Sequence, residues 1–126
     1  MTTITVTIPR ATWLHANQKL HWAEEARRKR TLRRMGYVAA RELDAEPIEQ
    51  TVHVAAFIGY LTGGRADPAN AGPAVKPLID GLVDFGLLVD DDSTHVLGPT
   101  FLRDPKSTEP GHYTVRLVLT PQEVPW

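Results

Sequence analysis

Three consecutive aspartates, Asp90, Asp91 and Asp92, are the densest group of chemically useful side chains in the sequence. Like charges this close repel one another, so the pKa of at least one carboxyl group is raised unless a cation or hydrogen bonds compensate. Such a run can be a solvated acidic turn that caps the next element. It can also supply the oxygen ligands of a hard divalent cation such as Mg²⁺.

The predicted path of the chain gives these aspartates further neighbours. A helix over 74–85 is about 18 Å long at about 1.5 Å per residue, and residues 87–91, if extended, cover about 16 Å on the way back. The aspartates are therefore expected beside the start of the same helix. The loop leading into this helix carries Asp67 and Asn70, and its first turn carries Lys76. Because Mg²⁺ keeps several waters and takes only one or two carboxylates, this spot is a candidate metal site.

Lys76 adds a second chemical function to that spot. Beside a metal-bound phosphodiester, its ammonium group can stabilise the developing charge or the leaving oxygen. The metal would lower the pKa of a bound water and orient it. Asp80 follows Lys76 by four residues, a spacing that favours an ordinary ion pair on one helix face. Together these residue types predict hydrolysis of a phosphate ester.

The 126 residues carry a net charge of −1, but the charge is divided unevenly along the chain. Residues 1–41 hold nine Lys and Arg against two Glu, and residues 42–126 hold five against thirteen acids, which gives +7 and −8. A basic helix can hold a DNA backbone without reading its sequence, or it can merely present a solvated face. The basic residues concerned are Arg27, Arg28, Lys29, Arg30, Arg33 and Arg34.

The acidic region contains several motifs in a fixed order. They are RADPAN (65–70), Lys76, Asp80-Gly81-Leu82, Gly86-Leu87 and DDDS (90–93). This series resembles the core motif of RusA-type Holliday-junction resolvases, which runs Asp-x-Asp-Asn, Lys, Asp-x-Leu, Gly and Asp-Asp. The resemblance spans about residues 4–119, and its specific part is 65–93. It implies a small, homodimeric, Mg²⁺-dependent endonuclease, common in phages and prophages, that cuts four-way DNA junctions symmetrically and leaves ligatable nicks.

The resemblance also implies roles for individual residues. The early segment Ala16 to Lys19 resembles the Asn-rich loop of that family, which adds two residues to the DNA-binding candidates. The cofactor implied is Mg²⁺, with Mn²⁺ as a second candidate. The candidates are Asp67, Lys76 and Asp91 for catalysis; Asp67, Asp90 and Asp91 for the metal, with Asn70 and Asp92 as further ligands; and Asn17 and Lys19, with the six basic residues above, for DNA.

Two departures from the family pattern bear on activity. Ala69 stands where the family has its second Asp-x-Asp aspartate, and three extra residues separate Asn70 from Lys76. Asp92 or His95 could replace the missing ligand. Two alternatives therefore stay open beside the nuclease. One is a weak or inactive junction-binding protein of the same fold, and the other is a metal-dependent hydrolase of small phosphoesters.

These residues need a scaffold, and hydrophobic periodicity predicts one α+β domain over residues 1–126. It has two layers, a mixed sheet of about four strands and two main helices. Pro77 is expected in the first turn of the second helix, Gly86 at its C-terminal cap, and Gly98-Pro99 at a break in the third strand. The predicted strands are Thr2–Pro9, Thr51–Leu61, Thr94–Leu102 and Tyr113–Thr120, the helices are Trp22–Leu43 and Ala74–Phe85, and residues 120–126 form a loose tail.

Composition excludes several other classes. The chain has no cysteine, which rules out disulfide scaffolds, thiolate zinc sites and cysteine nucleophiles. No apolar run approaches the length of a membrane span, and the first residues lack the features of a signal peptide. We expect a cytoplasmic protein of a bacterial or phage-infected cell, with branched DNA and a second copy of itself as partners.

Overall fold

The computed structural model describes all residues, 1–126, and has the predicted order of main elements. Two helices pack against one four-stranded sheet, so the α+β, two-layer prediction is confirmed. The elements are β1 (Thr2–Pro9), η1 (Arg10–Thr12), α1 (Trp22–Leu43), β2 (Val52–Gly59), η2 (Pro68–Ala71), α2 (Gly72–Phe85), β3 (Val96–Arg103) and β4 (His112–Pro121).

The sheet is mixed, with strand order β1-β4-β2-β3. β4 pairs antiparallel with both β1 and β2, whereas β2 pairs parallel with β3. A parallel pair needs a crossover connection, and α2 provides it between β2 and β3. The register aligns Val52 with Val96, so β2 and β3 begin at the same end of the sheet.

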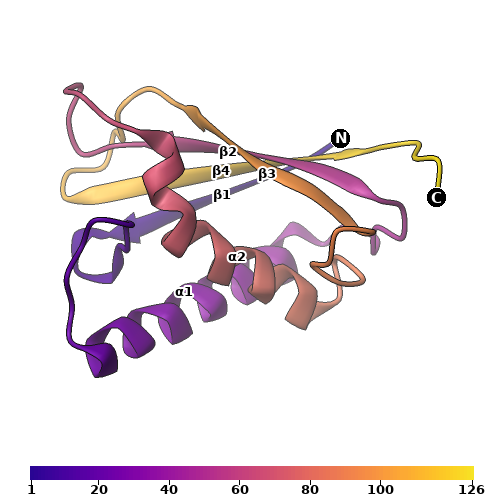
Figure 1. Ribbon diagram of the computed structural model, residues 1–126, viewed down its shortest axis with the longest axis horizontal. Coiled ribbons are helices and arrows are strands. Elements are labelled where there is room, and N and C mark those ends of the chain that lie inside the picture. Colours follow the sequence, from indigo (N-terminus) through magenta and orange to yellow (C-terminus); the bar gives the residue numbers. More distant parts are fainter.

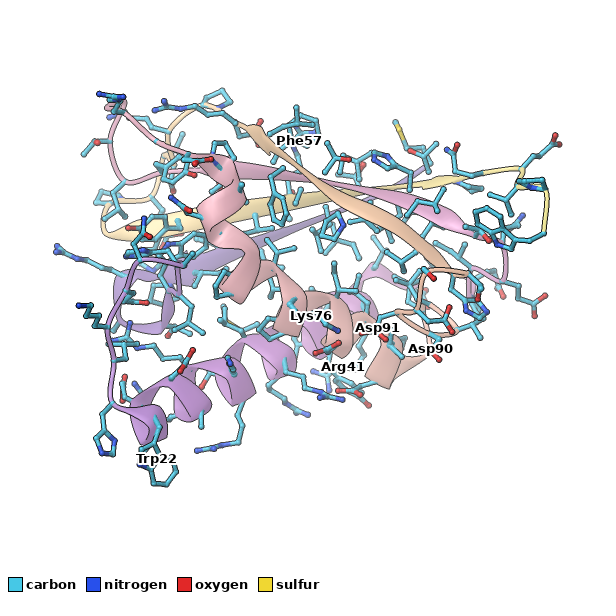
Figure 2. All side chains as sticks on the ribbon, in the orientation of Figure 1. Trp22, Arg41, Phe57, Lys76, Asp90 and Asp91 are labelled. Atoms are coloured by element: carbon cyan, nitrogen blue, oxygen red, sulfur yellow. The ribbon has the colours of Figure 1, made fainter.

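Both helices cover the same face of the sheet (Figure 1). That face is apolar because the strands alternate, and Ile4, Val6 and Ile8 of β1 all point into the core. The opposite face has no covering layer. There Phe57 is half-buried beneath the guanidinium of Arg116, whose Cζ lies 4.2 Å from the ring centroid (Figure 2).

The two helices pack closely because each has a glycine where they meet. A methyl group at Gly81 of α2 would lie 2.6 Å from the backbone nitrogen of Tyr37 and 2.9 Å from the carbonyl carbon of Gly36. A methyl group at Gly36 would in turn collide with the carbonyl oxygen of Leu78. This close approach fixes α2 against α1 and therefore fixes the side chains that the two helices present to each other.

The prediction for the start of α2 was wrong by two residues. The loop before it forms the short helix η2, and α2 begins at Gly72. Pro77 therefore lies beyond the first turn, where its missing N–H leaves the carbonyl of Pro73 without a helical partner. At the other end Gly86 adopts φ 94° and donates its N–H to the carbonyls of Leu82 and Val83, as a C-terminal cap should.

The last two strands also differ from the prediction. β3 continues through Gly98-Pro99, and the register with β2 shifts there by one residue, from His53–Leu97 to Ala55–Thr100. Such a bulge absorbs an extra residue without ending the strand. β4 runs to Pro121, and the N–H of Gln122 bonds to the carbonyl of Thr51, so the loose tail starts later than predicted.

β1 is an outer strand, and a groove separates its free edge from α1. The groove has a volume of about 540 Å³. Thr5, Val6 and Thr7 of β1 form one wall, and α1 contributes Arg30 and Arg34 among the residues of the other. Two cationic side chains therefore lie across the groove from the edge strand.

Candidate functional site

Lys76 lies between two carboxylates. Its Nζ donates a hydrogen bond to Oδ1 of Asp80 at 2.6 Å and another to Oδ2 of Asp91. Figure 2 shows Lys76 and Asp91 pointing toward each other beside α2. We call Lys76, Asp80 and Asp91 the Lys76 cluster. The ion pair with Asp80 is the i,i+4 pair predicted from the sequence.

Asp91 is held as a carboxylate in this cluster. The hydrogen bond from Lys76 is the main reason that its pKa is lowered from 3.8 to about 2. Asp90 stands next to it and accepts a hydrogen bond from the backbone N–H of Asp91 at 2.7 Å. The repulsion expected from adjacent acids is thus offset by an ammonium group and a backbone donor.

The chain returns from α2 toward its own side chains, as predicted. Leu87 and Leu88 are buried, and Leu88 forms a parallel bridge with Ile48 in the segment before β2. The N–H of Ile48 donates to the carbonyl of Leu87 at 2.8 Å. This pairing directs the aspartates past α2, so that Asp91 meets Lys76.

Asp67 does not join this group, which corrects the three-carboxylate prediction. Asp67 is the N-cap of η2, where its Oδ1 accepts from the N–H of Ala69 at 3.2 Å. No three or more His, Cys, Asp or Glu side chains come together as possible metal ligands, so Asp67, Asp90 and Asp91 do not form a shared site. The physical reason is the parallel crossover: Asp67 follows the end of β2, whereas the segment with Asp91 returns toward the start of β3.

Asp92 and His95 do not supply the ligand that Ala69 lacks. Oδ1 of Asp92 accepts from the N–H and hydroxyl of Thr94 and lies 2.8 Å from Nδ1 of His95. These contacts lower the pKa of Asp92 to about 2, the hydrogen bonds to Thr94 contributing most. The pair closes the turn before β3 and belongs to no group of three possible ligands, which contradicts the hypothesis that Asp92 or His95 replaces the missing aspartate.

Most basic residues of α1 already have partners. Arg27 and Arg28 both bond to Glu24, at 2.6 and 2.8 Å, and Arg33 bonds to Asp84 of α2 at 2.5 Å. Lys29 lies 3.6 Å from Glu25. Arg30 and Arg34 form no salt bridge, and Arg34 instead lies over the ring of Tyr37. Among the six residues of α1 predicted to bind DNA, these two arginines are therefore the most available to an outside anion.

A cleft of about 360 Å³ opens between α1 and α2. Its apolar lining consists of two prolines, Pro73 and Pro77, and the other side chains that line it are charged. The cleft includes Lys76, so it leads directly to the Lys76 cluster. We call it the basic cleft, and its lining residues are Lys29, Arg30, Arg33, Pro73, Lys76, Pro77 and Asp80. Four of these seven side chains are cationic and one is anionic.

The remaining predicted residues do not belong to the Lys76 cluster. The N–H of Ala16 donates to the carbonyl of Asn70 at 2.8 Å, which holds the early loop against η2. Asn17, Asp67 and Asn70 consequently line one pocket of about 250 Å³. Lys19 is exposed and has no ion pair. The predicted site is thus divided into the Lys76 cluster and this second pocket.

Two features of the site go beyond what the sequence predicts. The sequence separately predicts the Lys76–Asp80 pair and the approach of Asp91 to Lys76, but it does not predict that one ammonium group bonds to both carboxylates. The second feature is the hydroxyl of Tyr60, whose oxygen is buried without a hydrogen-bond partner. Tyr60 follows a buried apolar strand and therefore looks like part of the core, so its type and position give no signal of a polar role.

A scan of known protein families gives no match to this chain, and no curated protein matches its sequence. None of the helices is both long and apolar enough to cross a membrane.

Proposed function

We propose that the protein is a divalent-metal-dependent endodeoxyribonuclease that cuts four-way junction DNA, as a homodimer, in the cytoplasm of a bacterial or phage-infected cell. The observation that supports this most is the basic cleft that leads to Asp80 and Asp91. A cleft with four cationic side chains suits a phosphate backbone, and carboxylates at its end suit hydrolysis that needs a metal.

The donor set of the Lys76 cluster fits Mg²⁺ or Mn²⁺. Two carboxylates, Asp80 and Asp91, already meet at one cationic centre, and Asp90 is adjacent. Mg²⁺ is held by one or two carboxylates together with waters and substrate phosphates. A metal bound there would activate a water and neutralise charge on the attacked phosphate.

The chain's own side chains would prepare the phosphodiester. Arg30 carries no ion pair and lines the basic cleft, so it can bind a backbone phosphate by displacing its counterions. Lys76 holds Asp91 ionised before substrate arrives. When a phosphate and a metal enter, its ammonium can turn to the departing oxygen and stabilise the charge that develops there.

A homodimer suits this substrate. A four-way junction presents two equivalent strands, and a two-fold axis supplies two matching sites. Each protomer would cut one strand, which gives paired nicks.

The test is cleavage of a synthetic four-way junction against a linear duplex of the same sequence, with Mg²⁺, Mn²⁺ or EDTA. We expect metal-dependent nicking of the junction, abolished in Asp91→Asn while junction binding is retained. Glu49→Gln, which removes an exposed acid with no ion pair, is the matched control and should cut normally. Cutting by Asp91→Asn at the normal rate would refute the role of the Lys76 cluster.

A second candidate function is junction binding without cleavage. It is favoured by Ala69, which removes one acid, and by the lack of any three-carboxylate group. The same assay separates the two functions. Tight junction binding without nicking in either metal would support this second function.

A further inference from the structure

The pocket lined by Asn17, Asp67 and Asn70, here the Asp67 pocket, has walls of two kinds. It holds about 250 Å³ between the early loop, the end of β2 and η2. Some walls are aromatic rings, and the others are side chains that donate or accept hydrogen bonds. The lining residues are Trp13, His15, Asn17, Tyr60, Arg65, Ala66, Asp67, Asn70, Ala71 and Tyr113.

The aromatic wall is rigid. The rings of Trp13 and Tyr113 stack with centroids 4.1 Å apart and an angle of 5° between their planes. Tyr60 meets Tyr113 edge to face, with centroids 6.2 Å apart. Trp13 is buried, so this wall is anchored in the core.

The hydroxyl of Tyr60 has no hydrogen-bond partner although its oxygen is buried. Buried polar groups are nearly always paired, and an exception calls for a specific explanation. Burial, followed by the negative charge of Asp67, raises the pKa of Tyr60. The phenol is therefore a neutral hydrogen-bond donor that has no acceptor within the chain.

The other polar groups of the pocket are also available. Asn17 and Asn70 make no side-chain hydrogen bond within the chain, and Asp67 uses only Oδ1, toward the N–H of Ala69. The pocket thus offers amide donors and acceptors, one carboxylate acceptor and one phenol donor. This mixture of donors and acceptors matches the edge of a heteroaromatic ring.

A hollow beside the pocket would receive an anion. It shares Trp13, His15 and Tyr113 with the pocket. It adds Arg10, which has no ion pair, and Arg28, which already bonds to Glu24 and to the carbonyl of Trp13. Arginine beside an aromatic pocket is the arrangement that binds a phosphate next to a stacked base.

We infer that the Asp67 pocket takes one unpaired nucleobase of the DNA substrate, and that the neighbouring hollow takes the phosphate attached to it. This inference rests on the proposed function, because a junction is the source of a base that has left its pair. The Tyr60 hydroxyl then donates to a ring nitrogen or carbonyl, and Asp67 accepts from an N–H. A base outside its stack is read in this way by enzymes that bind single bases.

Tyr60→Phe separates this role from a structural one. Loss of an unpaired buried hydroxyl should stabilise the free protein, raising the midpoint of thermal unfolding by about 4 °C. The same change should weaken binding to a junction about two- to tenfold, the value of one hydrogen bond. Tyr37→Phe on α1 is the matched control, since its hydroxyl is not buried without a partner, and it should change neither.

The substrate side is tested with junctions that carry an abasic site, one position at a time, around the branch point. We expect one position at which removal of the base weakens binding to wild-type protein more than it weakens binding to Tyr60→Phe. Equal binding of Tyr60→Phe and wild type, with no sensitive position, would overturn the pocket and leave the proposed function standing.

A third measurement does not depend on junction binding. In amide NMR spectra titrated with the four 2′-deoxynucleoside 5′-monophosphates, we expect shifts at Asn17, Tyr60 and Asn70, and weaker ones in Tyr60→Phe. If the chain binds no junction, the proposed function fails and this titration still decides the pocket. No shift with any of the four would overturn it.

Discussion

Gly81 of α2 faces Gly36 of α1 backbone to backbone, and a methyl group at Gly81 would lie 2.9 Å from the carbonyl carbon of Gly36. This close approach sets the width of the basic cleft, because the residues that line it come from the same two helices. The position of Lys76 relative to Arg30 and Arg33 therefore depends on two residues that have no side chain.

Gly81→Ala should destabilise the fold. The added methyl meets only backbone atoms of α1, which cannot move aside as a flexible side chain can. Overpacking of this kind costs about 1–3 kcal/mol. Urea unfolding measures the loss, and Gly63→Ala, where a new Cβ has nothing within 4 Å, is the control that should stay within about 0.5 kcal/mol of wild type. A wild-type midpoint for Gly81→Ala would show that the helices are not this close.

Lys76→Gln should bind divalent metal more tightly than wild type. In the native protein the ammonium occupies the position between Asp80 and Asp91 where a cation would bind. Removing one partly exposed competing charge should increase the affinity for Mn²⁺ about three- to tenfold. Calorimetric titration with Mn²⁺ gives the answer, with Lys106→Gln on a distant loop as control. Weaker Mn²⁺ binding by Lys76→Gln would place the metal elsewhere.

Stability should decline in acid, and Asp91 should account for part of the decline. Its pKa is lowered from 3.8 to about 2 by the hydrogen bond from Lys76. A lowered carboxyl pKa stabilises the fold above the unfolded value, and the contribution is lost as the pH falls from about 4 through about 2. Thermal unfolding from pH 7 to pH 2 should show a smaller loss in Asp91→Asn than in wild type. Identical curves would contradict the ion pair.

Arg30 and Arg34 should carry more of the DNA affinity than their paired neighbours. Neither forms a salt bridge, whereas Arg33 is bound to Asp84 at 2.5 Å. Changing both free arginines to Ala should lower the slope of log affinity against log salt by up to about two, since each phosphate that is no longer neutralised accounts for about 0.9. Fluorescence anisotropy over a range of salt measures this slope. Arg33→Ala gives the comparison and should change the slope less. A larger change of slope in Arg33→Ala would show that an ion pair within the protein does not reduce the contribution of an arginine to DNA binding.

Periodicity was sufficient to predict the main elements. The alternation of Ile4, Val6 and Ile8 marks β1, and the spacing of Trp22 to Leu43 gives α1 with the bounds the structure has. These signals are local, because each element buries its own apolar face. Pro77 misled the prediction of where α2 starts, since the rule for a first-turn proline ignores the neighbouring η2 that leads the chain into the helix.

Only one part of the site could be predicted, namely the part that depends on the short return of residues 87–91 along α2. Asp91 reaches Lys76 because residues 87–91 run back along α2, which chain length alone suggests. The position of Asp67 depends instead on which strand β3 joins and in which direction. Strand pairing of this kind joins segments far apart in the sequence, and the residue spacing near Asp67 does not predict it.

The groove beside β1 indicates a second role for Arg30 and Arg34 that does not depend on a substrate. β1 presents eight residues, Thr2–Pro9, with no charged side chain on a free sheet edge. Sheet edges of this kind invite pairing with other chains, and proteins commonly protect them with charge. Arg30 and Arg34 line the groove beside this edge, together with Glu42, and we expect their positive charge to oppose pairing with another chain. Their loss would make the protein less soluble as well as weaker toward anions.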